Sequence, residues 1–174
     1  MDAEETFQTC MTAILAHEGG LTNDAGDPGG ITNWGISLRF LTQEDSEDHP
    51  TAETIKEMTQ GEAESIYRKF WWDRYQYVKF TQLIVVEKVF DLAVNMSGLA
   101  AHKLLQIAIN RLLEKPITVD GLLGQQTFAE ANSLDGNALR QGLRECAEHR
   151  YTEIVADNPA MEWALKGWLN RAAW

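Results

Sequence analysis

The sequence is poor in positive charge and has no long apolar run, and each shortage excludes a class of protein. Its 174 residues include 15 lysines and arginines against 26 acidic residues, for a formal net charge of −11. Phosphate binding needs clustered basic side chains, so we expect no nucleic acid partner. No apolar run approaches the roughly 18 residues of a membrane-spanning helix, so we expect no stable membrane insertion.

Cysteine and histidine are also scarce, and their spacing gives no sign of metal or redox chemistry. Cys10 and Cys146 lie far apart and form no CxxC pair, and the four histidines show no metal-ligand spacing. We therefore expect no metal and no other cofactor. Two buried thiols are the expected state of the cysteines, and a disulfide between them is left open.

The first six residues are acidic rather than basic, which is not typical of a secretory signal. On this pattern we expect the protein to be synthesised in the cytoplasm without a signal peptide. It would stay there unless another system exports it.

Apolar residues at helical spacing run through most of the chain and predict a mainly α-helical fold. Its length suits one domain or two small lobes that share a core. An amphipathic helix is expected over residues 4–18, where Gly19 and Gly20 end it. Residues 21–34 are rich in Asp, Asn, Gly and Pro and predict a tight loop, with a short hairpin as an option around residues 31–35.

The rest of the chain is expected to be helical between exposed connections. Residues 42–50 are polar and predict such a connection, and Thr59 with Glu62 has the pattern of a capping box, so a helix carrying Phe70 should follow. Apolar stripes predict helices over residues 86–96 and 100–113, the second of them buried. A turn is expected at residues 119–121, followed by a short helix from about Gln125 that Thr127 starts. Two further helices should follow, separated at Asn158-Pro159.

Glu18 is the leading catalytic candidate. The apolar stripe at residues 7, 11 and 14 has its next helical step at 18, so this carboxylate follows the buried face of the helix. Desolvation and the negative end of the helix dipole would both raise the pKa of a carboxyl group placed there. A carboxylic acid that keeps its proton can donate it to the leaving oxygen of a glycosidic bond. On the residues alone, a solvent-facing glutamate at a helix end stays an open alternative.

The loop after Glu18 carries groups that can hold a water molecule or a sugar hydroxyl. Asp24, Asp27, Thr32 and Asn33 lie within fifteen residues of Glu18. The same residue types are common in turns, so a purely structural role is equally open for them. Flat aromatic rings suit the apolar faces of sugars, and the aromatic candidates are Trp34, Trp71, Trp72 and Tyr75, which could equally be core residues.

The sequence His17-Glu18-Gly19-Gly20-Leu21, followed by Asp-Pro-Gly-Gly-Ile-Thr-Asn-Trp-Gly-Ile at residues 27–36, resembles the N-acetylmuramidases of glycoside hydrolase family 108. In that family the Glu of Glu-Gly-Gly is taken as catalytic, which assigns this role to Glu18. The resemblance implies a lysozyme-like helical globule in which a short loop or β-hairpin carries the active site. Thr32 follows Asp27 by five residues, one fewer than the usual phage-lysozyme spacing, which leaves the role of Thr32 open.

The resemblance implies cleavage of the β-1,4 bond between N-acetylmuramic acid and N-acetylglucosamine in peptidoglycan, with lysis of the bacterial cell wall. Glu18 would protonate the glycosidic oxygen, Asp27 would stabilise positive charge or orient water, and Thr32 would position that water. Asp24 competes with Asp27 as the second carboxylate, and the carboxylate separation would decide between inversion and retention. The expected substrate-binding residues are Asp24, Gly30, Asn33, Trp34, Asp91 and Asn95.

The second half of the chain is similar to the predicted peptidoglycan-binding domain of the same family. The similarity rests on residues 90–95, on Leu105-Gln106 and on the Asp-Gly-x-x-Gly-x-x-Thr pattern of residues 120–127. We expect a catalytic region over residues 1–80 and a helical peptidoglycan-binding-like region over residues 81–174, packed on it as one compact unit. Alternatively, this half only completes the core, and Asp91 and Asn95 hydrogen-bond to the loop instead of lining a substrate groove.

Two other functions stay open on the sequence: a lytic transglycosylase acting on the same bond, and a non-catalytic wall-binding or secretion-assisting protein. Without a signal peptide, the protein would act in the periplasm and cell wall only after release or delivery. A holin would serve a phage or prophage endolysin, whereas a secretion system would serve an antimicrobial effector, which a cognate immunity protein could control. The net negative charge gives no steering toward an anionic wall.

Overall fold

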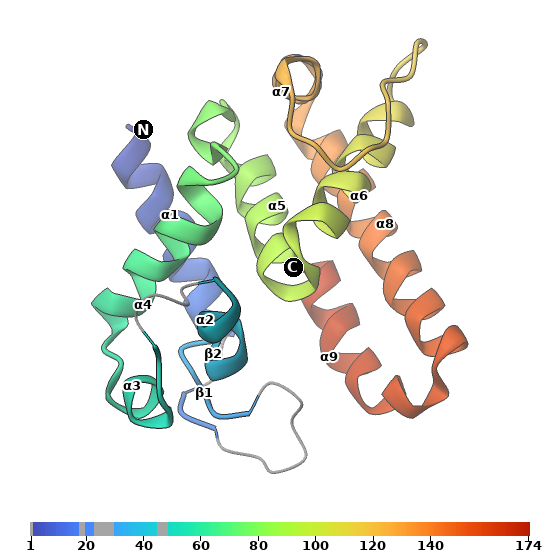
Figure 1. Ribbon diagram of the computed structural model, residues 1–174. Helices are drawn as coiled ribbons and strands as arrows, with labels where there is room; N and C mark the ends of the chain where they lie inside the picture. Colours follow the sequence, from blue (N-terminus) through green and yellow to red (C-terminus); the bar gives the residue numbers. More distant parts are fainter. Residues whose placement is uncertain (1, 18–19, 23–29, 45–48) are drawn as a thin grey trace. The chain divides into compact units, whose positions relative to one another are not determined.

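Figure 1 shows the computed structural model, which describes residues 2–17, 20–22, 30–44 and 49–174. Contacts within the chain group into two units, residues 2–74 and residues 75–174. Both units are mainly α-helical, as predicted, and the described residues of the first also form a two-stranded sheet. Among the described helices, none has the length and apolar character needed to span a membrane.

The first helix of the unit 2–74 follows its predicted apolar stripe. Helix α1 spans Ala3–His17, and the side chains of Phe7, Cys10, Met11 and Ile14 on one face are at most 1% exposed. At its start, the backbone N–H of Glu5 donates to a carboxylate oxygen of Asp2 over 2.8 Å, satisfying a donor that the helix leaves unpaired. The predicted helix is confirmed through His17, and Glu18 lies outside the described residues.

The remaining elements of this unit are short. They are β1 (Thr32–Asn33), β2 (Ile36–Ser37), α2 (Leu38–Glu44), α3 (Ala52–Glu57), α4 (Gln60–Tyr67) and a π-helical turn, η1 (Arg68–Asp73). The capping box of α4 is confirmed, because Thr59 and Glu62 satisfy each other's backbone N–H groups. Two expectations were wrong: Thr42–Glu44 continues a helix rather than starting a connection, and Phe70 lies in η1 beyond the end of α4.

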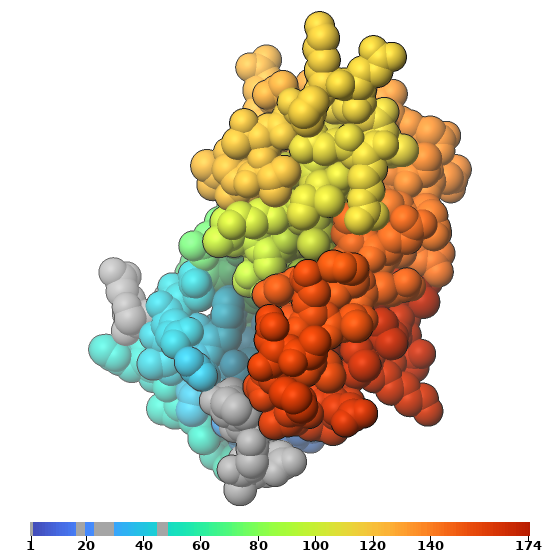
Figure 2. Space-filling view, turned by 90° about the vertical axis from the view of Figure 1, so that its right-hand side faces the viewer, coloured from blue at the N-terminus to red at the C-terminus, as the bar shows by residue number. Residues whose placement is uncertain are grey.

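The unit 75–174 is built around packed helices. Its elements are η2 (Tyr77–Lys79), α5 (Leu83–Met96), α6 (Gly98–Asn110), α7 (Gln125–Ser133), α8 (Gly136–Asp157), η3 (Pro159–Met161) and α9 (Glu162–Ala173). Helices α5, α6 and α8 pack on one another, and α9 folds back along α8 after the predicted break at Asn158-Pro159 (Figure 1). The connection from α6 to α7, yellow to gold in Figure 2, projects at one end of this unit.

Helix α6 is the buried helix that the sequence predicts, but it is shorter than expected. It ends at Asn110, whose side chain binds the backbone of Ile117. The Asn110 amide donates to the Ile117 carbonyl over 2.9 Å, and its oxygen accepts the Ile117 N–H over 2.8 Å. Leu112, predicted to lie in the helix, is beyond it and 42% exposed. Cys10 and Cys146 are both buried thiols and form no disulfide.

Candidate functional site

The predicted hairpin is present directly after the loop that carries the candidate acidic residues. Strand β1 pairs with β2 in antiparallel register, with Thr32 opposite Ser37 and Asn33 opposite Ile36. The two residues between the strands, Trp34 and Gly35, both have positive φ, 52° and 76°, which is typical of the type I′ turn that suits a tight hairpin. The sequence therefore places Gly35 where a left-handed backbone is needed.

A backbone bridge ties the segment after α1 to this hairpin. The N–H of Thr22 donates to the Thr32 carbonyl over 2.8 Å, and the N–H of Thr32 donates to the Thr22 carbonyl over 2.9 Å. This pair joins the two ends of the segment in which Asp24 and Asp27 occur. The chain that leaves α1 is therefore returned to β1 within a few residues of Glu18.

The turn residue Trp34 is held by two hydrogen bonds of its own and by one from its neighbour Asn33. A non-glycine residue with positive φ is strained, at a cost on the order of 1–3 kcal/mol, and persists only where its surroundings fix it. Its indole Nε1–H donates to the Met58 carbonyl over 3.0 Å, and Tyr67 donates its hydroxyl hydrogen to the Trp34 carbonyl over 3.1 Å. The Asn33 amide donates to the Ile55 carbonyl over 3.0 Å. Helices α3 and α4 thus fix the hairpin.

The structure describes only some of the predicted site residues. Glu18, Asp24 and Asp27 lie outside the described residues. Gly30 is exposed with φ +72°, and the half-buried Thr32 donates its hydroxyl hydrogen to the Gly30 carbonyl over 3.4 Å. Both therefore lie at the end of the loop segment, where a substrate contact remains a prediction.

The predicted substrate-binding role of Asn33 needs correction. This side chain is 7% exposed, and its amide donates to the Ile55 carbonyl and, at 3.4 Å, to the Met58 carbonyl. An amide that is already used by two buried carbonyls is not offered to a sugar. Asn33 is therefore a residue that anchors the hairpin to the end of α3.

Three of the four aromatic candidates pack on other rings. Trp71 stacks on Phe40 with ring centroids 4.7 Å apart, and Trp72, which is 2% exposed, meets Phe7 edge-on at 5.3 Å. Tyr75, in the other unit, meets the His102 ring edge-on at 4.7 Å. These contacts support the core alternative for the three rings and leave Trp34, partly exposed at the hairpin turn, as the sugar-stacking candidate.

Asp91 is a core residue rather than a lining residue of a substrate groove. Its side chain is 0% exposed and its two carboxylate oxygens accept from Lys88 Nζ at 3.3 Å and from Arg171 Nε at 2.7 Å. Lys88 also donates to the Arg171 carbonyl over 2.6 Å. Burial lowers the pKa of Lys88, and the neighbouring Asp91 charge opposes that shift. The three residues form a buried ion cluster that joins α5 to α9.

Asn95, one turn further along α5, contacts α8. Its side-chain oxygen accepts the Tyr151 hydroxyl over 2.6 Å, and burial raises the pKa of Tyr151. Among the described residues, the Asn95 side chain therefore bonds α8, and the alternative of a hydrogen bond to the loop stays a prediction. Asn95 is half-buried, so a sugar contact through its amide nitrogen remains a prediction.

The Asp-Gly-x-x-Gly-x-x-Thr motif is held by one buried glutamine of α6. Gln106 accepts the Gly121 N–H over 2.7 Å and donates to Asp120 Oδ1 over 2.8 Å and to Thr127 Oγ1 over 3.3 Å. Its bond to Asp120 lowers the pKa of that carboxyl group. Thr127 was expected to start α7, but Gly124 precedes the helix and Thr127 is buried within it. The motif therefore builds the core of this unit.

A buried histidine also binds the turn at Gly121. His102 is 1% exposed; its Nδ1–H donates to the Gly121 carbonyl over 3.2 Å, because a carbonyl can only accept. Its Nε2 then accepts the Tyr77 hydroxyl over 2.8 Å, which assigns one neutral tautomer. Burial lowers the pKa of His102 to about 4, so the ring stays neutral at physiological pH.

This histidine makes the stability of the unit depend on pH. Since the pKa is about 4 in the folded chain and about 6.5 in the unfolded chain, its contribution is complete above pH 6.5 and is lost as the pH falls toward 4. We expect wild type to lose up to roughly 3 kcal/mol more unfolding free energy than His102→Gln over this window. Urea unfolding at pH 7.0 and pH 4.5 measures the difference. Equal losses in both proteins would contradict the assignment.

Two grooves on the described surface have none of the predicted hairpin residues in their walls. One, of about 750 Å³, lies in the unit 2–74 beside α3 and α4, with Met58 and Glu62 among its walls. The other, of about 560 Å³, lies in the unit 75–174 between α6 and α8. Sequence reasoning missed this second groove, although the basic residues of both segments were visible in the sequence.

Comparisons with known proteins give the family of this chain and a similar fold. The glycosyl hydrolase 108 family matches residues 11–97, and the family described as a predicted peptidoglycan domain matches residues 100–173. The solved structure of SagA from Brucella abortus is similar in fold, with a TM-score of 0.79 and 24% identity, over 98% of this chain and 91% of that chain. No protein with curated annotation matches the sequence significantly.

The helical fold with its short hairpin is lysozyme-like. The chain belongs to the glycosyl hydrolase 108 family, and it is a glycoside hydrolase that acts on peptidoglycan. The match of that family extends to residue 97, whereas α5 packs with α6 and α8 in the unit 75–174. The predicted boundary at residue 80, and the packing of the two regions as one unit, stay predictions.

Proposed function

We propose that this protein hydrolyses the β-1,4 bond between N-acetylmuramic acid and N-acetylglucosamine, with Glu18 as the general acid. The observation that supports this most directly is the geometry on both sides of Glu18. The buried stripe of α1 runs through Ile14, the helix ends at His17, and the Thr22–Thr32 bridge pairs a residue that follows α1 with the hairpin. Glu18 follows this helix directly in the sequence and precedes the hairpin, and a carboxylic acid in a desolvated setting can hold its proton for a leaving oxygen.

The roles proposed for the neighbouring residues rest on their places in the sequence and on the family resemblance. Asp27 would stabilise the positive charge that develops on the sugar or orient the attacking water. Thr32 would help to position that water with a hydroxyl that lies at the edge of the loop segment. Asp24 is the competing second carboxylate, and Gly30 and Trp34 would contact the glycan. Carboxylates about 6.5–9.5 Å apart would give inversion, and about 5–5.5 Å would give retention.

The reaction products distinguish hydrolysis from transglycosylation. Purified sacculi digested with the protein should yield fragments that end in reducing N-acetylmuramic acid, because water attacks the cleaved sugar. Mass spectrometry after borohydride reduction measures this directly. Anhydro-muramic ends would instead assign the protein as a lytic transglycosylase, and intact sacculi would assign it as a non-catalytic wall-binding protein.

The biological setting that we propose is lysis of bacterial walls. The protein would reach the periplasm through a holin lesion, as a phage or prophage endolysin, or through a secretion system, as an antimicrobial effector with a cognate immunity protein. Its role as a wall hydrolase is the same in both settings.

A further inference from the structure

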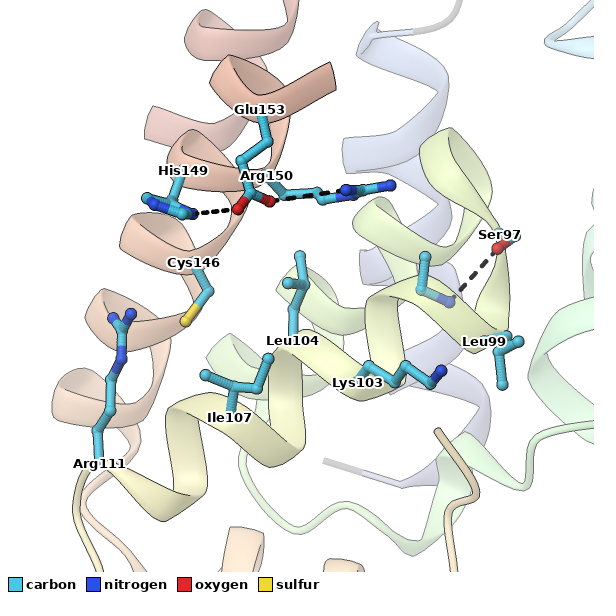
Figure 3. A pocket seen from close by; sticks show the side chains of 11 residues that line it. Ser97, Leu99, Lys103, Leu104, Ile107, Arg111, Cys146, His149, Arg150 and Glu153 are labelled. Carbon is cyan, nitrogen blue, oxygen red and sulfur yellow. Dashed lines mark hydrogen bonds and ion pairs between the residues drawn. The ribbon is translucent and has the colours of Figure 1, made fainter. Parts of the chain in front are cut away.

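The groove between α6 and α8 is lined by one face of each helix (Figure 3). On α6 lining residues recur at helical spacing, at positions 100, 103, 104 and 107, and position 111 directly follows the helix. On α8 they recur in the same way, at positions 146, 149, 150 and 153. Residues at these spacings share a helix face, so the two stripes form the facing walls of one groove of about 560 Å³.

The walls of this groove are basic, although the protein is strongly acidic. Lys103 and Arg111 come from α6 and its end, and Arg150 and His149 come from α8. Glu153 is the one carboxylate among the residues described as lining it. Three permanent positive charges against one negative charge therefore face the groove in a chain with a net charge of −11. This local reversal of sign favours an anionic ligand.

The basic side chains are weakly engaged by the protein itself. Glu153 lies 3.4 Å from His149 Nδ1 and 3.6 Å from an Arg150 nitrogen, and Glu145 lies 3.6 Å from an Arg111 nitrogen. The side chains of these pairs are about half exposed or more, and ion pairs of that kind contribute little. Lys103 is exposed, and its charge helps to lower the pKa of the exposed Asp120 carboxyl group without forming one of the ion pairs described for this chain. A ligand carboxylate can therefore compete for these cations.

The floor of the groove is apolar. Leu104 and Cys146 are buried, Ile107 is half-buried, and Leu99 stands 53% exposed at one end. Lys103 and Arg111 are eight residues apart along α6, which is about 12 Å at 1.5 Å per residue. An extended peptide covers that distance with three or four residues. The groove thus has the length, floor and charge for a short, anionic, aliphatic peptide.

We propose that this groove binds the peptide stem of peptidoglycan, with Lys103, Arg111 and Arg150 engaging its carboxylates and with the apolar floor receiving its alanine methyl groups. The proposal rests on the proposed function in one respect, that peptidoglycan is the substrate. The stem carries free carboxylates, whereas the amides and hydroxyls of the glycan carry no charge that would need a basic wall. The groove lies within residues 97–153, largely inside the match to the peptidoglycan domain.

A binding measurement on the full chain tests this. The probe is the free tetrapeptide L-Ala–γ-D-Glu–meso-diaminopimelate–D-Ala, titrated into ¹⁵N-labelled protein. We expect amide shifts confined to residues 97–111 and 146–153. The double variant Lys103→Gln, Arg150→Gln should raise the Kd at least tenfold, because charge-assisted hydrogen bonds are lost. Lys166→Gln, which removes an exposed lysine of α9 away from the groove, should leave the Kd unchanged within twofold.

A second binding measurement uses the wild-type protein alone. The same tetrapeptide with its carboxylates amidated should bind wild type at least tenfold more weakly. The proposal is overturned if the tetrapeptide does not bind at millimolar concentration, if amidation or the double variant leaves the Kd unchanged, or if uncharged chitotetraose shifts the same amides with equal affinity. The binding experiment cleaves no bond. If the peptide does not bind, only the proposed role of the groove is contradicted, whereas a failure to release reducing ends contradicts only the proposed function.

Discussion

Glu18→Gln is expected to lower the rate of peptidoglycan hydrolysis by about 10²–10⁴-fold, because an amide cannot donate the proton that general acid catalysis contributes. Turbidity clearance of purified sacculi and the release of reducing ends both measure this rate. The substitution keeps the size and polarity of the side chain, so substrate binding should change much less than kcat.

Two comparisons make this result specific. Glu148→Gln removes an exposed carboxylate of α8 and should leave the rate unchanged within experimental error. Asp27→Asn should cost more activity than Asp24→Asn if Asp27 is the second catalytic group, and the reverse order would assign that role to Asp24. Full clearance by folded Glu18→Gln would remove Glu18 from the mechanism.

The second large effect concerns stability. Asp91→Ala is expected to lower the free energy of unfolding by roughly 3–5 kcal/mol, because the buried charges of Lys88 and Arg171 then lose the carboxylate that neutralises them. Both cations are held in the folded chain by the Asp91 carboxylate, and Lys88 is only 1% exposed. Urea unfolding at pH 7 measures the change.

The matched control for this prediction is Asp157→Asn, which removes an exposed carboxylate at the end of α8 and should change stability by less than about 0.5 kcal/mol. If Asp91 instead lined a sugar groove, Asp91→Ala would raise KM with little loss of stability. That outcome would restore the substrate-binding role that the structure argues against.

The case of Asp91 shows where sequence patterns stop being informative. Helix α5 is buried nearly all round, so its apolar stripe does not distinguish an inward from an outward aspartate. Asp91 pairs with Arg171, eighty residues further along the chain, and no local spacing indicates such a partner. Asn33 was misread for the same reason, because the carbonyls that bind its amide belong to α3 and the residue after it.

Local signals, in contrast, predicted local structure well. The capping box of α4, the break at Asn158-Pro159 and the buried stripe of α1 depend on residues within one or two helical turns, and all three are present. The basic groove depends on both local sequence patterns and contacts between distant residues. The spacing of Lys103 with Arg111 and of His149 with Arg150 is visible in the sequence, but only the packing of α6 on α8 brings the two stripes together.

The central claim is that Glu18 delivers a proton to a sugar linkage. A crystal structure of Glu18→Gln with a bound chitooligosaccharide tests it most directly. We predict that the substituted side chain lies about 2.6–3.2 Å from a glycosidic oxygen, or one water molecule away. A side chain that faces bulk solvent while the sugar chain is bound elsewhere on the protein would contradict the claim.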